Sequence, residues 1–362
     1  MYLKELNLVN YKNILQENFV FTHRINCFVG PNGVGKTNIL DSIYSLSMTK
    51  SYFNPISSQN INHNSDFFML EGIYENEDKR EKVLYSLKKG QKKTIKRNGK
   101  VYDKISDHIG LIPSVIISPS DRDLILEGSD VRRKFMDSVI SQMDKDFLRA
   151  SIQYNKALSQ RNALLKYFAA NRTFDELSLA AYDEQLVTYG LEIYKKRSVF
   201  LEAFLPLFTN AYAQLTSQSE PVEVRYKSQL HEGNFQDLLK ESLSKDRMAQ
   251  YSTVGLHKDD LLFDLQGYPI KKYGSQGQQK TFLVALKLAQ YELLKMETGI
   301  KPILLLDDIF DKLDDSRVER LIQLVSQENY GQIFISDTHD KRTREVVERV
   351  RENFEIFNLD YE

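Results

Sequence analysis

The chain has 362 residues, of which 41% are hydrophobic and 27% charged, and its formal net charge is −1. This length and composition are enough for one large or two ordinary domains with their own hydrophobic cores. Because the charge is balanced, any contact with nucleic acid has to come from a local basic patch rather than from the protein as a whole.

No apolar stretch approaches the roughly 18–20 residues that a membrane-spanning helix needs, so we expect no membrane contact. Met1 leads directly into a strand-like segment at residues 3–8, and we expect no signal peptide. The single cysteine, Cys27, allows no internal disulfide and lies in an apolar segment, which favours a buried thiol over a catalytic one. We therefore expect a cytoplasmic protein.

Residues 2–29 contain two segments of alternating polarity followed by an apolar run at 25–29, which predicts three strands. Residues 30–37 then fit the pattern G-x-x-x-x-G-K-[ST]. After them Ile39, Ile43 and Leu46 follow helical spacing. Because a strand precedes the motif and a helix follows it, we interpret it as a phosphate-binding loop (P-loop) rather than an accidental glycine-rich turn.

In such a loop, backbone N–H groups and the helix N-terminus surround the phosphates of a nucleotide such as ATP. Lys36 would reach the β- and γ-phosphates, and Thr37 would be a ligand of Mg²⁺. The candidate nucleotide-binding residues of this segment are Gly30, Pro31, Asn32, Gly33, Val34, Gly35, Lys36, Thr37 and Asn38.

Short β-like runs between residues 67 and 102, with an Asn98-Gly99 turn, predict an antiparallel meander. It is rich in cations, namely Lys88, Lys89, Lys92, Lys93, Lys96, Arg97 and Lys100. These charges could neutralise several DNA phosphates if they share a face, although they could equally be solubilising surface charge. Lys195, Lys196 and Arg197 are a second, weaker DNA candidate.

From about residue 130 to residue 218 the chain is almost wholly helix-forming. Apolar residues advance by three, four or seven positions between Phe135 and Leu165, and again between Phe174 and Leu215. The break at 171–173 predicts two long helices in an antiparallel hairpin, inserted into the nucleotide domain. A strand at 222–226 and a helix at 234–250 follow.

Ser275 stands at the N-cap position of a helix predicted over 276–297. Its hydroxyl, the unobstructed backbone at Gly277 and the neighbouring Gln278 suit an approaching phosphate, although an ordinary capped helix would look the same. Because the P-loop already encloses its own nucleotide, this second phosphate site favours an ATP-dependent homodimer with nucleotide between two subunits.

An apolar strand at 302–306 ends in Asp307 and Asp308. Asp307 is the expected second Mg²⁺ ligand, and Asp308 would orient or deprotonate the attacking water, so Asp308 and Lys36 are the candidate catalytic residues. Alternatively, the two carboxylates cap the next helix. Lys312-Leu313-Asp314 and a strand at 332–336 follow, with His339 just after it. The remaining histidines show no metal-ligand spacing, so we expect no structural metal.

This layout resembles the ABC-type head ATPases of the SMC class, and within that class it is most similar to the RecF family. The similarity extends over nearly the whole chain, through residues 118–121 (SPSD), 132–137 (RRKFMD), 160–166 (QRNALLK), 257–260 (HKDD) and 274–279 (GSQGQQ). It implies an α/β fold, an ABC-type P-loop ATPase head with an antiparallel β subdomain and an inserted helical arm. Residues 1–120 and 251–362 would form the head, and 121–250 the arm.

The resemblance also implies a DNA-repair ATPase that dimerises on ATP, binds DNA at gaps and single-strand/duplex junctions, works with RecO and RecR, and supports RecA loading. ABC ATPases usually carry Glu where this chain has Asp308, which implies slow hydrolysis and a switch rather than a motor. His339 lies near the place of the family's switch histidine. No residue is assigned to the family's metal-contacting glutamine, and the segment after the strand at 115–117 offers Ser118, Ser120 and Asp121 instead.

Two other functions remain open. A membrane-transporter ATPase subunit would leave the helical insertion and the additional N-terminal strands unexplained. A small-molecule kinase or GTPase would not need the Ser275 motif, and the chain has no Asn-Lys-x-Asp base-reading motif. DNA binding measured with and without ATP would separate the three.

Overall fold

The structure is a computed structural model that describes residues 1–76, 79–216, 220–309, 315–349 and 353–360. The chain divides into two compact units. The head unit consists of Met1–Arg122, Asn210–Ser219 and Ser275–Glu362, and the arm unit of Asp123–Thr209 and Glu220–Gly274.

The head unit contains a five-stranded parallel sheet in the order β14-β3-β13-β12-β8. Its strands are β3 (Ile25–Val29), β8 (Ser114–Ile117), β12 (Ile303–Asp307), β13 (Ile333–Asp337) and β14 (Phe354–Asn358). Every residue of β3, β8, β12 and β13 is buried, which explains why these strands appear in the sequence as continuous apolar runs.

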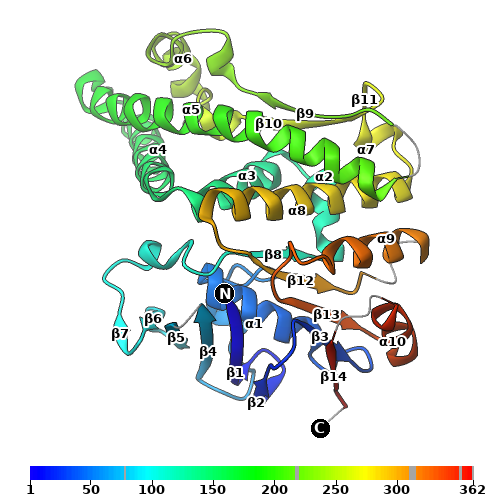
Figure 1. Cartoon of the computed structure of the whole chain (residues 1–362). Helices are drawn as coiled ribbons and strands as arrows, with labels where there is room; N and C mark the ends of the chain where they lie inside the picture. Colours follow the sequence, from blue (N-terminus) through cyan, green and yellow to red (C-terminus); the bar gives the residue numbers. More distant parts are fainter. Residues whose placement is uncertain (77–78, 217–219, 310–314, 350–352, 361–362) are drawn as a thin grey trace. The chain divides into compact units, whose positions relative to one another are not determined.

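Helices lie on both sides of the parallel sheet. On one side α1 (Lys36–Met48) shares a hydrophobic core with alternate residues of the sheet, among them Phe28, Leu305 and Phe334. Figure 1 shows α8 (Gln276–Thr298) and α9 (Asp315–Val325) on the opposite side. The short helix α10 (Asp340–Glu348) follows β13.

A six-stranded antiparallel sheet, in the order β2-β1-β4-β5-β6-β7, covers the other side of the core around α1. Its strands are β1 (Tyr2–Tyr11), β2 (Ile14–Val20), β4 (Phe67–Asn76), β5 (Lys79–Lys88), β6 (Thr94–Arg97) and β7 (Lys100–Val101). The predicted meander is confirmed. At its predicted turn, Asn98 and Gly99 have φ of 48° and 82°, the left-handed pair that a tight hairpin turn requires.

The arm unit begins with α2 (Asp123–Leu126), α3 (Ser129–Met143), α4 (Lys145–Asn171) and α5 (Glu176–Leu215), the last of which ends in the head unit. The prediction of one long helix up to residue 171 is wrong because the chain breaks between α3 and α4. Asp144 is extended there (φ −131°), and its carboxylate accepts hydrogen bonds from the backbone N–H groups of Asp146 and Phe147. The break therefore comes from an N-cap inside a continuous apolar stripe.

The second half of the arm unit contains β9 (Val222–Lys227), α6 (Phe235–Ala249), β10 (Asp260–Leu265), β11 (Tyr268–Pro269) and α7 (Ile270–Tyr273). The three strands form an antiparallel sheet in the order β11-β10-β9. Because β10 pairs with β9, the arm unit continues to Gly274, whereas the expected arm ended at residue 250. The expected domain boundaries remain a proposal.

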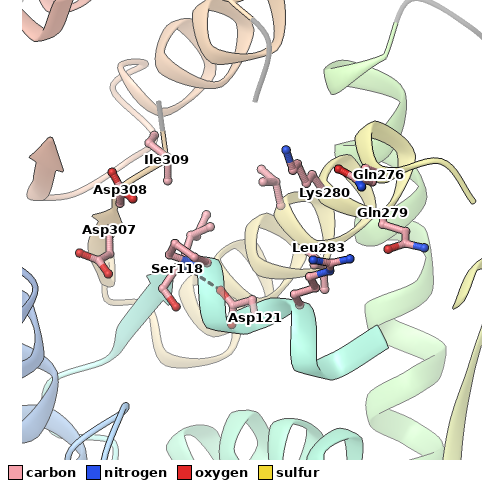
Figure 2. A pocket seen from close by; sticks show the side chains of 13 residues that line it. Ser118, Asp121, Gln276, Gln279, Lys280, Leu283, Asp307, Asp308 and Ile309 are labelled. Carbon is pink, nitrogen blue, oxygen red and sulfur yellow. Dashed lines mark hydrogen bonds between the residues drawn. The ribbon is translucent and has the colours of Figure 1, made fainter. Parts of the chain in front are cut away.

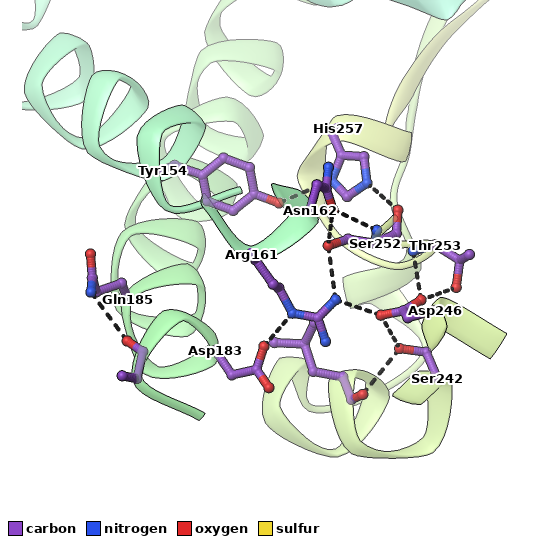
Figure 3. Close-up of polar contacts among 12 residues, drawn as sticks. Tyr154, Arg161, Asn162, Asp183, Gln185, Ser242, Asp246, Ser252, Thr253 and His257 are labelled. Atoms are coloured by element: carbon purple, nitrogen blue, oxygen red, sulfur yellow. Dashed lines mark hydrogen bonds and ion pairs between the residues drawn. The ribbon is translucent and has the colours of Figure 1, made fainter. Parts of the chain in front are cut away.

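Buried charges hold the arm unit together. Arg161 is fully buried on α4, and its guanidinium donates to Asp183 on α5 at 2.5 Å and to Asp246 on α6 at 2.6 Å (Figure 3). A second buried arginine, Arg197, binds Asp137 and Asp259. Removing one partner of such a pair leaves a buried charge uncompensated, so these residues fix the packing of the helices.

Candidate nucleotide-binding site

The P-loop connects β3 to α1 in the head unit, as predicted. Gly33 and Gly35 have φ of 90° and 109°, which L side chains rarely adopt. Gly30 is required for a different reason, because a Cβ there would lie 2.2 Å from the backbone oxygen of Leu359. Side chains at these three positions would therefore strain the loop or clash with Leu359.

Lys36 is the first residue of α1 and is 8% exposed. Its ammonium donates to the backbone oxygens of Gly30 and Pro31, each at 2.7 Å. Burial lowers the pKa of Lys36, while the charges of Asp308, Asp337 and Asp307 oppose that change. The loop thus holds a buried cation beside three carboxylates, close to where an anionic phosphate would enter.

Thr37 and Asp307 meet although 270 residues separate them in the sequence. The Thr37 hydroxyl donates to Oδ1 of Asp307 at 2.8 Å, and the Ser336 hydroxyl donates to the same oxygen at 2.7 Å. Burial raises the pKa of the Asp307 carboxyl, and these two hydroxyl groups lower it. A hydroxyl and a carboxylate oxygen side by side are hard oxygen ligands of the kind that Mg²⁺ takes in P-loop sites.

Asp308 follows β12 in a left-handed conformation with φ of 49°. Its backbone N–H donates to the hydroxyl of Ser336 at 3.0 Å, so the end of β13 fixes the turn. Its side chain lines the same pocket as Lys36 and Thr37.

The pocket above the P-loop has a volume of about 370 Å³. Of the residues predicted for the site, it is lined by Asn32, Gly33, Gly35, Lys36, Thr37, Asn38, Asp307 and Asp308. Val34 instead lines a neighbouring cavity of about 500 Å³ on the β2 and β14 side of the loop. The structure therefore brings together most of the predicted phosphate, metal and catalytic residues.

Sequence reasoning missed several residues at this site. The amide of Asn13, in the turn after β1, donates to the oxygen of Gly33 at 2.8 Å and accepts from Asn38 at 2.6 Å. Phe53, Ser336 and Thr338 also line the pocket. Ser336 and Thr338 could have been found from topology, because β13 lies between the P-loop strand and the Asp307 strand. Asn13 and Phe53 have no such signal.

Of Ser118, Ser120 and Asp121, which the sequence offers instead of an assignable metal-contacting glutamine, only Ser120 lines the P-loop pocket. Asp121 is 3% exposed and forms an ion pair with Lys287 of α8 at 2.7 Å. The hydroxyl of Tyr52, in the segment after α1, donates to the same carboxylate. Asp121 thus connects the rim of the pocket to α8.

Ser275 is the N-cap of α8, as predicted, and is exposed. Its hydroxyl accepts from the backbone N–H of Gln278 at 3.2 Å, and the Gln278 side chain accepts from the Ser275 N–H at 2.8 Å, which completes a capping box. A Cβ on Gly277 would lie 2.6 Å from Nη1 of Arg317. None of these three residues lines the P-loop pocket of its own chain.

A second pocket, of about 270 Å³, lies between the start of α8 and the end of β12. Figure 2 shows Gln276, Gln279 and Lys280 on one side and Asp307 and Asp308 on the other. The end of β12 therefore borders both cavities.

The identity of the switch histidine stays a prediction. Thr338 lines the P-loop pocket, whereas His339 is exposed and its ring nitrogen shares a 2.7 Å hydrogen bond with the Thr338 hydroxyl. The Lys312-Leu313-Asp314 motif lies outside the described residues.

The cations predicted between Lys88 and Lys100 divide into two groups, those engaged with other protein groups and those exposed to solvent. Arg97 donates twice to the Glu81 carboxylate, at 2.6 and 2.9 Å, and Lys93 donates to the oxygen of Thr49 at 2.7 Å. Burial lowers the pKa of Lys93. Lys88, Lys92 and Lys100 are exposed, so the charge available to a ligand is smaller than the sequence suggests.

The parallel sheet, the P-loop and the Asp-ended strand two positions away define an ABC-type ATPase head of the SMC kind, which confirms the expected fold class. Residues 2–359 match the RecF/RecN/SMC N terminal domain family. The DNA replication and repair protein RecF of Flavobacterium johnsoniae is 56% identical over 359 residues, covering 99% of this chain and 100% of the relative. The protein of that name in Phocaeicola vulgatus is 48% identical, with 99% and 97% covered. The chain therefore belongs to the RecF family.

Solved structures agree with this assignment. Two structures of the recombination mediator protein RecF in the RecFOR pathway, designated RecF-ATPrS and RecF-ATP, match with TM-scores of 0.88 and 0.87 at 31% and 33% identity. They cover 99% and 94% of this chain, and 97% and 92% of those chains. An SmcHead structure, with a TM-score of 0.57 and 14% identity, shares the fold.

The membrane-transporter alternative is not favoured, because the full-length relatives are replication and repair proteins. Within the part of the chain that the structure describes, no helix is long and apolar enough to cross a membrane.

Proposed function

We propose that the protein binds ATP in the P-loop pocket and hydrolyses it slowly, as an ATP-gated DNA-binding switch in recombinational repair and replication restart. This proposal rests on one observation: the same pocket is lined by Lys36, Thr37, Asp307 and Asp308. A cation for the phosphates, oxygen ligands for a metal and a carboxylate for water are the parts that phosphoryl transfer needs. Matching solved structures designated RecF-ATP and RecF-ATPrS support ATP as the nucleotide.

Thr37 and Asp307 would hold Mg²⁺, which supplies charge neutralisation at the phosphates when it is bound. Their 2.8 Å hydrogen bond supports this role because it already brings the two oxygen atoms together within the pocket. Lys36 binds the β- and γ-phosphates, and Asp308 orients or deprotonates the attacking water.

Ser275, Gly277 and Gln278 contact the nucleotide of a second subunit, so ATP drives homodimerisation. Two observations support this arrangement: Ser275 is exposed at the N-terminus of α8, and it does not line its own chain's P-loop pocket. An exposed helix N-terminus presents backbone N–H groups and a partial positive charge to a phosphate.

The dimer binds DNA at gaps and single-strand/duplex junctions in the cytoplasm, together with RecO and RecR, and supports RecA loading. The RecFOR pathway of the matched structures supports these partners. DNA binding that requires ATP would separate this function from a transporter subunit or a small-molecule kinase.

The decisive test of the pocket is Lys36→Met, which keeps the apolar part of the side chain and removes the charge. ATP affinity should fall by roughly 10- to 100-fold, the worth of one charge-assisted hydrogen bond, and ATP-dependent DNA binding should fall with it. Isothermal titration with Mg-ATP and gel-shift assays on gapped DNA measure the two effects.

Lys341→Met is the matched control, because that lysine is 92% exposed on α10 and should leave both measurements unchanged. If Lys36→Met binds ATP as tightly as the wild-type protein, the P-loop is not the ATP site. If the wild-type protein binds DNA equally well with and without ATP, the protein is not an ATP-gated switch.

A further inference from the structure

The arm unit has a groove that the nucleotide site does not use. It lies where α4 ends and α5 begins, next to the last turns of α6, and has a volume of about 550 Å³. We call it the arm groove. Six of its lining residues carry the argument: Leu165, Phe168, Arg172, Phe174, Arg247 and Met248.

The floor of the arm groove is apolar. Leu165 and Phe168 are 1% and 7% exposed and form a small hydrophobic cluster with Leu179, against which Phe174 packs. Met248, which also lines the groove, is 80% exposed. Scattered apolar side chains on a surface are ordinary, but apolar residues gathered at a concave site suit a binding function.

The only charged residues among those that line the groove in the described chain are two arginines. The Arg247 guanidinium lies 4.0 Å from the centroid of the Phe174 ring, which holds it over the groove. Arg172 is the left-handed C-cap of α4, with φ of 53°. Within the described residues, neither guanidinium has a carboxylate partner within 4.0 Å. The groove therefore pairs an apolar floor with positive charge that is not neutralised from within.

The surroundings favour a protein ligand over nucleic acid. Asp175 directly follows the groove-lining Phe174, and Glu176 is the first residue of α5. The Asp175 carboxylate accepts hydrogen bonds from the N–H groups of Leu177 and Ser178. Fixed negative charge there repels a continuous phosphate backbone, which brings one charge per nucleotide. A short peptide can instead place its few carboxylates at the two arginines only.

We propose that the arm groove is a docking site for a segment of another protein, one that carries acidic residues next to two or three large apolar side chains. The apolar side chains enter the groove over Leu165 and Phe168, and the carboxylates pair with Arg172 and Arg247. This is the chemistry by which amphipathic segments bind grooves between helices. The site is independent of the nucleotide pocket.

The test selects a random 12-residue peptide library, displayed on phage, against the full-length protein. The enriched peptides are then synthesised, labelled and titrated by fluorescence anisotropy. We expect enrichment of peptides that combine Asp or Glu with Leu, Ile, Phe or Met. A single-stranded oligonucleotide is added as a competitor and should not displace them.

Two variants locate the binding site. Arg172→Asn with Arg247→Gln removes both charges, and Asn tolerates the left-handed φ at position 172. Met248→Asp places a carboxylate at an exposed position of the rim. Each should weaken peptide binding at least about tenfold. The matched control, Lys195→Gln with Lys227→Gln, removes two exposed charges elsewhere on the arm unit and should change binding less than about twofold.

Thermal melting of each variant confirms that the arm unit is folded. The proposal is overturned if no peptide is enriched or if the enriched peptides lack acidic residues. It is equally overturned if both variants bind as tightly as wild type, or if the oligonucleotide displaces the peptide through the same two arginines. A second copy of the protein as occupant would appear as self-association that Met248→Asp abolishes, which also overturns the proposal.

Discussion

Asp308 carries a backbone requirement as well as a chemical one. At φ of 49° it lies in the left-handed region, which Asp and Asn tolerate better than longer side chains because they bond to the local backbone. The end of β13 holds this conformation through the Ser336 hydroxyl. The conformation is a physical reason for Asp rather than Glu at this position.

Asp308→Asn should therefore be structurally neutral and chemically severe. The substitution keeps the shape and the left-handed tolerance but removes the negative charge that we propose acts on water, so ATP turnover should fall by roughly 100-fold or more. Mg-ATP affinity should change less than about threefold. Phosphate release and isothermal titration provide the readouts, with the exposed Asp66→Asn as control. Turnover at the wild-type rate would reduce Asp308 to a turn residue.

We expect His257 to make the stability of the arm unit depend on pH. Its Nε2–H donates to the oxygen of Ser252 at 2.8 Å, and Nδ1 faces the hydroxyl of Tyr154 at 3.3 Å (Figure 3). Burial lowers the pKa of His257 from 6.5 to about 4, and the hydrogen bond to Ser252 opposes this change. Lys258 and Arg133 act in the same direction as burial, and Asp246 acts against it.

Because the folded state resists protonation of His257, its contribution to stability is complete above about pH 6.5 and is lost as the pH falls toward 4. The expected loss is at most about 3 kcal/mol. In His257→Gln, the free energy of unfolding measured in urea should decline less over this pH window than in wild type. Equal slopes for the two proteins would show that His257 does not contribute to the acid sensitivity.

Among the elements, strands β5, β6 and β7 show how strand pairing decides which cations share one face of the sheet. Leu84 and Lys96 face each other in the ladder, as do Val83 and Arg97. Val83 is buried, whereas Arg97 is engaged with Glu81 at the edge of the same face. The strand alternation therefore places Lys96 on the opposite face from Arg97.

Replacing Lys88, Lys92, Lys96 and Lys100 with Gln should weaken DNA binding and reduce its log–log salt slope by about 0.9 for each phosphate that is no longer neutralised. Arg97→Gln is the comparison, because its charge is already neutralised by Glu81 and the salt slope should stay unchanged. Filter binding at several salt concentrations measures both. If the variant with all four substitutions keeps the wild-type salt slope, DNA binds on another surface.

At the scale of the whole molecule, nucleotide and dimer are expected to depend on each other. In the proposed dimer, the P-loop of one subunit and the exposed start of α8 of the other would contact the same nucleotide. A ligand that binds only the dimer stabilises it by mass action, so association should rise with ATP concentration.

Ser275→Arg should block dimerisation while leaving the P-loop able to bind ATP, because the long side chain occupies the space of the incoming phosphate. Analytical ultracentrifugation with a non-hydrolysable ATP analogue should give a wild-type dimer and a mutant monomer. Asn234→Arg is the matched control, since it removes the N-cap of α6 in the arm unit without touching α8. A mutant that dimerises like wild type would leave Ser275 as a helix cap.

The sequence predicts what is encoded locally. The P-loop, the Asn98-Gly99 turn and the N-cap at Ser275 each follow from a few adjacent residues, and all three are confirmed. Asp144 is a residue type typical of a helix N-cap, but the continuous apolar stripe around it favours a single helix over two. Asn13 and Phe53 could not be predicted, since only the tertiary fold brings them to the pocket. The pairing of β10 with β9 is not predictable from adjacent residues, because α6 separates the two strands in the sequence.

The strand that leads into the P-loop has an unusual place in the order of synthesis. Both neighbours of β3, β13 and β14, come from beyond residue 330. A growing chain on the ribosome therefore makes its phosphate loop early but cannot complete the sheet that shapes it until more than 300 further residues have emerged. We therefore expect that nascent chains cannot hold nucleotide until β13 and β14 have emerged.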